Sequence, residues 1–449
     1  KICRPDSISS HKNYLYTTPI TISMANVGEL VEADTKDQTF KGILMESPDP
    51  HVVVIKLSSG YNIGIDKKKV KGIKTVGKPQ KKEHKKEQVK PKKDLKTISI
   101  LHTGGTIASQ VDYETGAVTA KFTPEDLLSM FPELKDVANI QSRLMRNMAS
   151  DDMRFAHYNL MAKEIEKEIK SGTDGIIITQ GTDTMHYTSA ALAFILHDLP
   201  VPVILVGSQR SSDRGSSDAA MNLICAAKAI AQSDFCDVAI CMHKNTNDDS
   251  CVLLPATKSR KMHTSRRDAF QAVNSKPWAE IEPNKGIKFL RDDYRQRQNL
   301  QLKIMPIKES LKIGLAKAHP NMFAKELDAY EGFDGLVLEG TGLGHFPINE
   351  IDEFTKEHKK ILKTIEKLAK SMPVVMAPQT IYGRLQMNVY TPGRIIQEAG
   401  VLGNYSDMTP ETTLIKLAWL LSNYPEHVKT MMHENLAGEL NKRIGADFL

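Results

Sequence analysis

The sequence lacks any hydrophobic run of about 18 residues, the length that a bilayer-spanning helix requires. It has only five cysteines in 449 residues, and none of them forms a CxxC pair suited to zinc or a redox couple. It also has no P-loop motif for nucleotide phosphates. These absences argue against a membrane protein, a disulfide-stapled secreted domain, a zinc finger and a P-loop ATPase. We therefore expect a soluble, cytoplasmic protein with reduced, buried thiols.

The first 23 residues have neither an initiating methionine nor the long apolar stretch of a secretory signal. We expect residues 1–23 to be a non-native or disordered extension and Met24 to be the true start. The net charge of +6 lies in the segment Lys78 to Lys96, which has nine lysines against three acidic residues, while the rest of the chain is about neutral. This basic segment is either a solubilising spacer or a contact for RNA or an acidic partner, and its composition leaves both possibilities open.

The length predicts two or three domains, and the pattern of apolar residues places them. Short alternations of apolar and polar residues predict a small all-β barrel. After the lysine-rich segment, apolar runs alternate with amphipathic stretches, which predicts an α/β fold with parallel sheets. We expect a barrel over 24–77, a linker over 78–94, a catalytic α/β domain over 95–290, a connector over 291–311 and a second α/β domain over 312–449.

Three short segments are candidates for chemistry. Thr103 to Ala108 (TGGTIA) directly follows a predicted strand, and two glycines there allow a ligand to approach the backbone closely. Gly181 to Met185 (GTDTM) follows another strand, with a hydroxyl and a carboxylate together. Lys258 to Phe270 is basic and polar. Taken singly, they are equally consistent with a glycine turn, a helix cap and a solvated face.

Taken together and in this order, the three segments resemble the asparaginase/glutaminase family. Thr106 stands in TGGTIA, Thr182 and Asp183 stand in GTDTM, and Lys261 precedes a polar stretch, with spacings of 76 and 79 residues. The resemblance runs from about Thr97 to the C-terminus. It also includes Ser150, which is similar to the family's substrate-binding serine, and Tyr113, which is similar to its mobile tyrosine. It implies a two-domain asparaginase-like fold.

Within this family the chain is similar to the D subunits (GatD) of archaeal-type glutamyl-tRNA(Gln) amidotransferases, which have a small barrel ahead of the catalytic region. Free asparaginases usually lack the barrel and the lysine-rich tether. The string KMHTSRRDAF is similar to the D-subunit form of the lysine motif, with His263 where bacterial asparaginases tend to have asparagine. The loop 339–345 replaces the family's asparagine-bearing glycine loop, which leaves the choice of amino acid open.

Amide hydrolysis needs a nucleophile, a group that removes its proton, and donors for the oxyanion. The resemblance implies that Thr106 is the nucleophile. Thr182 then relays a proton to Lys261, and Asp183 holds that lysine in place. Tyr113 is an alternative base on Thr106. Asp183 and Ser150 are expected to bind the substrate's α-amino and α-carboxylate groups beside Thr182 and Tyr113. No metal is required.

The D-subunit resemblance also implies partners. The ammonia would pass to a GatE-type partner subunit that holds Glu-tRNA(Gln) and uses ATP and Mg²⁺ to make Gln-tRNA(Gln). We expect no cofactor in this chain, and by analogy a homodimer within a heterotetramer. Two alternatives stay open: a stand-alone L-asparaginase/glutaminase, and a catalytically inactive scaffold that binds tRNA or protein. The sequence does not distinguish glutamine from asparagine as the donor.

Overall fold

The computed structural model forms two compact units, one of residues 1–83 with 111–118 and the other of the remaining residues. Along the described residues, no helix combines the length and the apolar character that crossing a membrane requires. The structure describes residues 25–47, 49–57, 62–77, 91–105, 107, 109–111, 118–120, 123–212 and 216–445.

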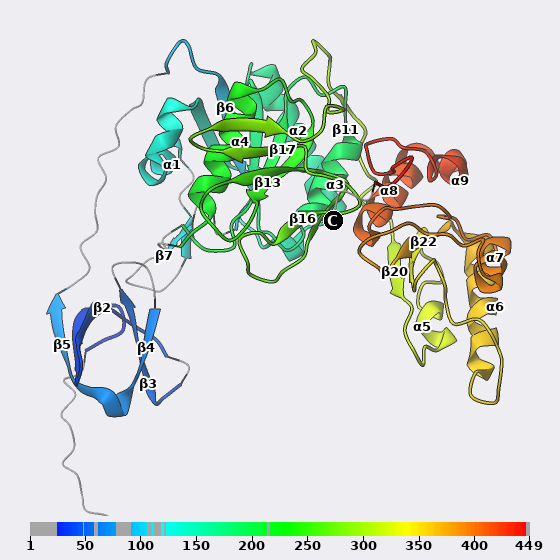
Figure 1. The fold of residues 1–449 in the computed structure, drawn as a ribbon, viewed down its shortest axis with the longest axis horizontal. Helices are drawn as coiled ribbons and strands as arrows, with labels where there is room; N and C mark the ends of the chain where they lie inside the picture. Colours follow the sequence, from blue (N-terminus) through cyan, green and yellow to red (C-terminus); the bar gives the residue numbers. More distant parts are fainter. Residues whose placement is uncertain are drawn as a thin grey trace, which may run out of the picture. The chain divides into compact units, whose positions relative to one another are not determined.

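The first unit contains a five-stranded antiparallel sheet, drawn in blue in Figure 1, so the predicted all-β domain is confirmed. Alternate residues of its strands point into a small core, as Val31 and Ala33 do in the first strand. The order is β4-β3-β2-β1-β5, and a short 3-10 helix precedes β5. The strands are β1 (Leu30–Thr35), β2 (Thr39–Met45), β3 (Val52–Leu57), β4 (Asn62–Asp66) and β5 (Val70–Gly77).

The second unit is built around an eight-stranded sheet of order β18-β17-β14-β13-β12-β10-β6-β9. Its strands are β6 (Thr97–His102), β9 (Asn139–Leu144), β10 (Gly175–Thr179), β12 (Val203–Val206), β13 (Val238–His243), β14 (Cys251–Pro255), β17 (Ala279–Glu282) and β18 (Gly286–Phe289). The five strands from β9 to β13 are parallel, as predicted. The other three strands are antiparallel, so the expectation of a wholly parallel sheet is wrong at this edge. Residues 244–250 are too few for the crossover that a parallel β14 would need.

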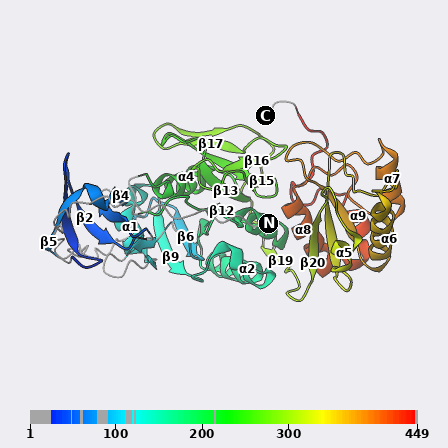
Figure 2. The same cartoon turned by 90° about the horizontal axis from the view of Figure 1, so that it is seen from below.

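Helices cover both faces of this sheet, which Figure 2 shows with α2 and α4 on opposite sides of the strands. Because side chains alternate along a strand, Ile176 and Ile178 pack with α2 and α3 while Ile177 packs with α1 and α4. The helices are α1 (Pro124–Met130), α2 (Phe155–Lys170), α3 (Met185–Ile195) and α4 (Ala219–Gln232).

A smaller sheet of three parallel strands, β20-β21-β22, follows. Helices α5, α6 and α7 cover one face, and α8 covers the other while also packing on α3 (Figure 2). One apolar core therefore runs through α8 from the larger sheet to the smaller one. The elements are β20 (Ile313–Lys317), α5 (Ala324–Asp328), β21 (Gly335–Gly340), α6 (Lys356–Ser371), β22 (Val374–Pro378), α7 (Thr391–Glu398), α8 (Pro410–Asn423) and α9 (Val428–Met431).

Three two-stranded ladders lie outside the larger sheets. The ladder of β15 and β16 matters most here, because it holds the lysine of the predicted site. The pairs are β7 (Ser109–Val111) with β8 (Val118–Ala120), β11 (Leu196–His197) with β19 (Lys303–Ile304), and β15 (Ser259–Lys261) with β16 (Phe270–Ala272).

Candidate active site

Three loops meet at the carboxyl ends of β6, β9 and β10, where ligands bind in open α/β sheets. Gly104 and Gly105 both have positive φ angles, 119° and 86°. A Cβ on Gly105 would lie 2.7 Å from the backbone nitrogen of Gly181, and one on Gly104 would lie 2.3 Å from the carbonyl oxygen of Met148. Only glycine fits there. The glycines therefore bring the three loops into backbone contact.

Lys261 makes the central contacts of the site. Its Nζ donates to Thr182 Oγ1 at 2.8 Å and to Asp183 Oδ1 at 2.7 Å. The Lys261 side chain is 11% exposed, whereas that of Asp183 is 69% exposed, so the lysine lies at the base of the site and the carboxylate at its rim. The structure thus brings together three of the predicted residues from two distant segments of the chain.

The β15–β16 ladder fixes the position of Lys261. Lys261 pairs with Phe270, and the backbone N–H of Met262 donates to Ala269 at 2.6 Å. His263, which departs from the bacterial pattern, accepts the backbone N–H groups of Ser265 and Arg266 at 3.0 Å each through Nδ1. Its role is therefore to cap the turn between the two strands.

Ser150 begins a short 3-10 helix, Ser150–Asp152, beside the loop of Gly181. Its hydroxyl is buried and would lie 3.1 Å from a Cβ on Gly181. Its carbonyl oxygen accepts from Thr184 Oγ1 at 2.5 Å. In the part of the chain that the structure describes, the Ser150 hydroxyl has no hydrogen-bond partner. A buried hydroxyl without a partner is costly, and it is typical of a group that a ligand satisfies.

Two predicted site residues, Thr106 and Tyr113, lie outside the described residues. Gly105, which precedes Thr106, lies against the backbone of Gly181, the residue before Thr182. The TGG loop and the Thr-Asp pair are therefore neighbours at this edge of the sheet.

Sequence reasoning missed an ion pair that supports the lysine strand. Arg260 directly precedes Lys261 and donates to Glu411 Oε1 at 2.9 Å. Glu411 lies in the first turn of α8. His186 lies beside this pair, with Nε2 3.8 Å from Glu411 Oε1. Burial lowers the pKa of His186 to about 4, although Glu411 acts in the opposite direction. No local pattern in the sequence links Arg260 to a helix so far along the chain.

A second missed residue, His102, supports the site from within the sheet. Its ring nitrogens contact Thr179 Oγ1 at 2.6 Å and Ser142 Oγ at 2.9 Å. Burial lowers the pKa of His102 to about 3, so the ring is neutral at physiological pH. The apolar run of β6 ending in a histidine was the available signal for a buried ring.

Gln180 also went unpredicted. Both polar atoms of its side chain are buried and have no partner among the described residues.

The described ranges contain no group of three or more His, Cys, Asp or Glu residues that could hold a metal ion. The loop after β21, where the sequence departs from the family, has Glu339 in contact with Lys317 at 3.2 Å, and burial lowers the pKa of His345.

Comparisons with known proteins agree with this architecture. Residues 97–295 match the family model "Asparaginase, N-terminal", residues 312–432 match "Glutaminase/Asparaginase C-terminal domain", and residues 25–76 match "GatD N-terminal domain". The D subunit of glutamyl-tRNA(Gln) amidotransferase from Pyrococcus furiosus is 45% identical over 416 residues, covering 91% of this chain and 92% of that protein. The corresponding D subunit from Methanococcus maripaludis strain C6 is 42% identical over 432 residues, covering 94% and 100%.

Solved structures give the same fold. The thermostable L-asparaginase from Thermococcus kodakarensis has a TM-score of 0.68 and 29% identity, covering 77% of this chain and all of that one. L-asparaginase I from Vibrio cholerae has a TM-score of 0.64 and 28% identity, covering 77% and 99%. The predicted asparaginase-like fold is thereby confirmed.

Proposed function

The chain belongs to the family of D subunits of glutamyl-tRNA(Gln) amidotransferase, and on that premise we propose that it is the amidase subunit that releases ammonia from glutamine. One observation carries this proposal: Lys261 Nζ lies within hydrogen-bonding distance of both Thr182 Oγ1 and Asp183 Oδ1. A lysine between a hydroxyl and a carboxylate can move a proton, which amide hydrolysis requires.

We assign the nucleophile to Thr106. Its hydroxyl oxygen attacks the side-chain amide carbon of glutamine, and its proton passes through Thr182 to the neutral amine form of Lys261. The tetrahedral intermediate collapses when the amide nitrogen takes a proton and leaves as ammonia, and water then hydrolyses the threonyl ester to glutamate. Backbone N–H groups near Thr182 and Asp183 are the candidates for the oxyanion hole.

The substrate's charged groups need partners at the rim of the site. The exposed carboxylate of Asp183 suits the α-amino group, because the two have opposite charge. The unpartnered hydroxyl of Ser150 suits the α-carboxylate as a donor. Tyr113 is the remaining candidate, either for closing over the substrate or for assisting the base.

The wider reaction involves other molecules. As a D subunit, the chain is one part of a multi-subunit amidotransferase. We propose that ammonia passes to a GatE-type subunit, which binds Glu-tRNA(Gln) and holds the ATP and Mg²⁺ of the activation step. We also propose a cytoplasmic homodimer within a heterotetramer.

The first test is ammonia release from glutamine and from asparagine by the purified chain, alone and then with a candidate E subunit and Glu-tRNA(Gln). Strong stimulation by the E subunit and the tRNA supports the amidotransferase role. Full activity on asparagine, unchanged by either addition, would instead favour a stand-alone enzyme like the two L-asparaginases that share this fold. If Thr106→Ala left ammonia release unchanged, the nucleophile assignment would be wrong.

A further inference from the structure

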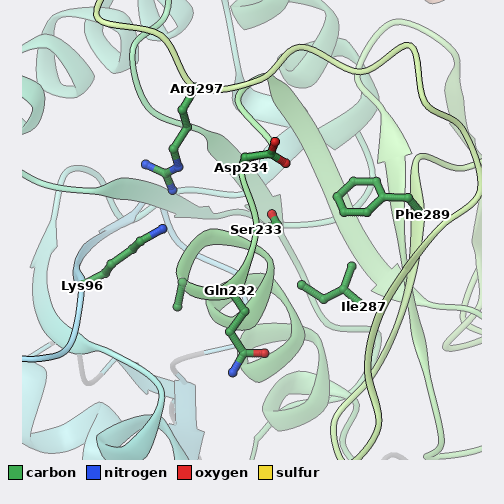
Figure 3. Close-up of a pocket in the computed structure, with 8 residues that line it drawn as sticks. Lys96, Gln232, Ser233, Asp234, Ile287, Phe289 and Arg297 are labelled. Carbon is green, nitrogen blue, oxygen red and sulfur yellow. The ribbon is translucent and has the colours of Figure 1, made fainter.

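A cavity of about 650 Å³ lies at the amino ends of β6 and β13, at the opposite edge of the sheet from Lys261 (Figure 3). Lys96, directly before β6, and Arg297 point toward each other on one side of it, with Asp234 between them and Phe289. None of the residues that line it takes part in the proposed amidase chemistry. The cavity is therefore separate from the proposed amidase site.

On the cationic side of the cavity, Arg297 and Lys96 have N–H groups beyond those that donate to the protein backbone. Arg297 donates to the carbonyl oxygens of Asp174 at 2.7 Å and Ile230 at 2.8 Å, and Lys96 shares the second of these at 3.3 Å. These contacts use two of the five guanidinium N–H groups and one of the three ammonium N–H groups. Within the described residues, no ion pair involves Lys96 or Arg297, although Asp174 lies near enough to act on both. Burial and the charge of Arg297 lower the pKa of Lys96, so an anion here would relieve a repulsion.

The opposite side of the cavity is flat and apolar. The ring of Phe289 in β18 stacks on Tyr294, with centroids 4.2 Å apart and planes 18° apart. Ile287 extends the same wall, as Figure 3 shows. The Tyr294 hydroxyl donates to Asp234 Oδ1 at 2.9 Å, and the exposed Asp234 carboxylate lies between the apolar wall and the cations in Figure 3, with Oδ2 left as an acceptor.

We propose that this cavity binds one nucleotide of an RNA, with its phosphate between Lys96 and Arg297 and its base against Phe289. The three parts of a nucleotide match the three parts of the site: an anion for the cations, a planar ring for the aromatic wall, and base N–H groups for Asp234. An acidic peptide would satisfy the cations alone. The choice of RNA rests on the proposed function, in which a tRNA is the substrate, and on the run of nine lysines in the sequence from Lys78 to Lys96.

The test measures binding of a fluorescein-labelled tRNA(Gln) transcript to the full chain, alone and with the partner subunit, across a range of salt concentrations. Lys96→Met keeps the aliphatic stem and removes the charge, and Lys359→Met, at an exposed position of α6, is its matched control. We expect Lys96→Met to weaken binding about fivefold and to lower the salt slope by about 0.7–0.9, the value for one lost phosphate contact. Phe289→Ala should weaken binding about tenfold with an unchanged salt slope, because stacking is not ionic.

Titration with adenosine and guanosine 5′-monophosphate distinguishes the source of the nucleotide. Saturable binding that Lys96→Met abolishes supports the same site with a free nucleotide as its ligand. Wild-type affinity and salt slope in both cavity variants, with no mononucleotide binding, would overturn the proposal. Loss of partner association without loss of RNA binding would overturn it in favour of an acidic protein contact. RNA-independent ammonia release by the same variants tests the amidase separately, since it should not change.

Discussion

Lys258 and Lys261 stand three residues apart, one just before β15 and the other at its end, and have opposite surroundings. Lys258 is 2% exposed and pairs with the fully buried Asp407 at 2.9 Å, whereas Lys261 reaches the solvent-facing Asp183. Burial lowers the pKa of Lys258, and Asp407 opposes that shift. The same amino acid therefore serves structure at one position and, as we propose, catalysis at the other.

Substitution by methionine should separate these two roles. Lys261→Met should lower kcat for glutamine hydrolysis by about 10²–10⁴, because it removes the proton acceptor, and should leave stability nearly unchanged, because its ion-pair partner Asp183 is 69% exposed. Lys258→Met should lower the free energy of unfolding by about 3–5 kcal/mol, because it leaves the Asp407 carboxylate buried without its counter-charge. Steady-state ammonia release and urea unfolding on both variants check this. Equal losses of stability would contradict the assignment of Lys261.

Ser150 offers a test of substrate binding that is independent of the proton chemistry. Ser150→Ala removes a buried hydroxyl without a described partner, so stability should stay within about 1 kcal/mol of wild type or rise. KM for glutamine should rise, because the α-carboxylate loses a donor. The matched control is Ser189→Ala, whose buried hydroxyl donates to Ala256 at 2.7 Å. That variant should lose about 1–2 kcal/mol of stability and keep KM. An unchanged KM in Ser150→Ala would remove this serine from the site.

His186 should make stability depend on pH. Its pKa is lowered to about 4 in the folded chain, against about 6.5 when unfolded, so the unfolded chain binds the additional proton between these values. Stability is therefore lost as pH falls from about 6.5 to about 4, at roughly 1.4 kcal/mol per pH unit. His186→Gln should show a shallower fall than wild type between pH 6 and pH 5 in urea unfolding. Parallel curves would contradict a neutral, buried His186.

At the scale of elements, α8 connects the smaller sheet to the lysine strand. Its core residues pack on α3 and on the smaller sheet, while Glu411 in its first turn holds Arg260, the neighbour of Lys261. The helix thus links the packing of the smaller sheet to β15, the strand that carries Lys261.

Glu411→Gln tests that connection. The neutral amide should hold Arg260 more weakly and let β15 shift, so kcat should fall about tenfold or more with KM nearly constant, since small displacements of reacting groups are costly. Glu411→Asp should recover part of the loss, and Glu398→Gln, at an exposed position of α7, should have no effect. A rise in KM with constant kcat would mean that Glu411 acts on substrate binding instead.

Elements differ in how far the sequence predicts them. The buried strands β10 and β12 are continuous apolar runs between turn signals, so their sequences predict them directly. The direction of β14 was missed because Cys251–Pro255 is a continuous apolar run without the alternation typical of an antiparallel strand, and the available signal was the short link of residues 244–250. The contact of Arg260 with Glu411 was unpredictable for another reason: it depends on how α8 packs, which no local pattern records.

At the scale of the whole molecule, the all-β domain and the tether are separable from the α/β unit in the sequence. The α/β unit begins at a firm anchor, where Lys92 exchanges hydrogen bonds with Asn139 and pairs with Asp136 at 2.9 Å. A truncation that starts at Pro91 keeps this anchor.

We expect the chain without residues 24–90 to retain glutamine hydrolysis and to lose part of its salt-dependent affinity for the partner or the tRNA, namely the part contributed by the removed lysines. A second variant without residues 24–77 keeps the lysine-rich tether and should recover most of that part. Ammonia release and binding titrations with the assembled complex check both. Unchanged affinity in both variants would sink the hypothesis that this region contacts the partner or the RNA.

The segment after α9 joins the two α/β sheets through buried polar groups. Glu439 pairs with Lys416 of α8 at 2.6 Å, with both side chains fully buried, and Asn441 bonds Asp407 and the backbone of Asn274. During synthesis, these residues leave the ribosome after everything that they hold together. In a nascent chain that ends before Glu439, the Lys416 ammonium would have carbonyl partners at Met432 and Glu434 but no counter-charge, so we expect the junction between the sheets to form only after Glu439 has been made. The last contacts of the α/β region are therefore expected to form after synthesis of the segment that follows α9.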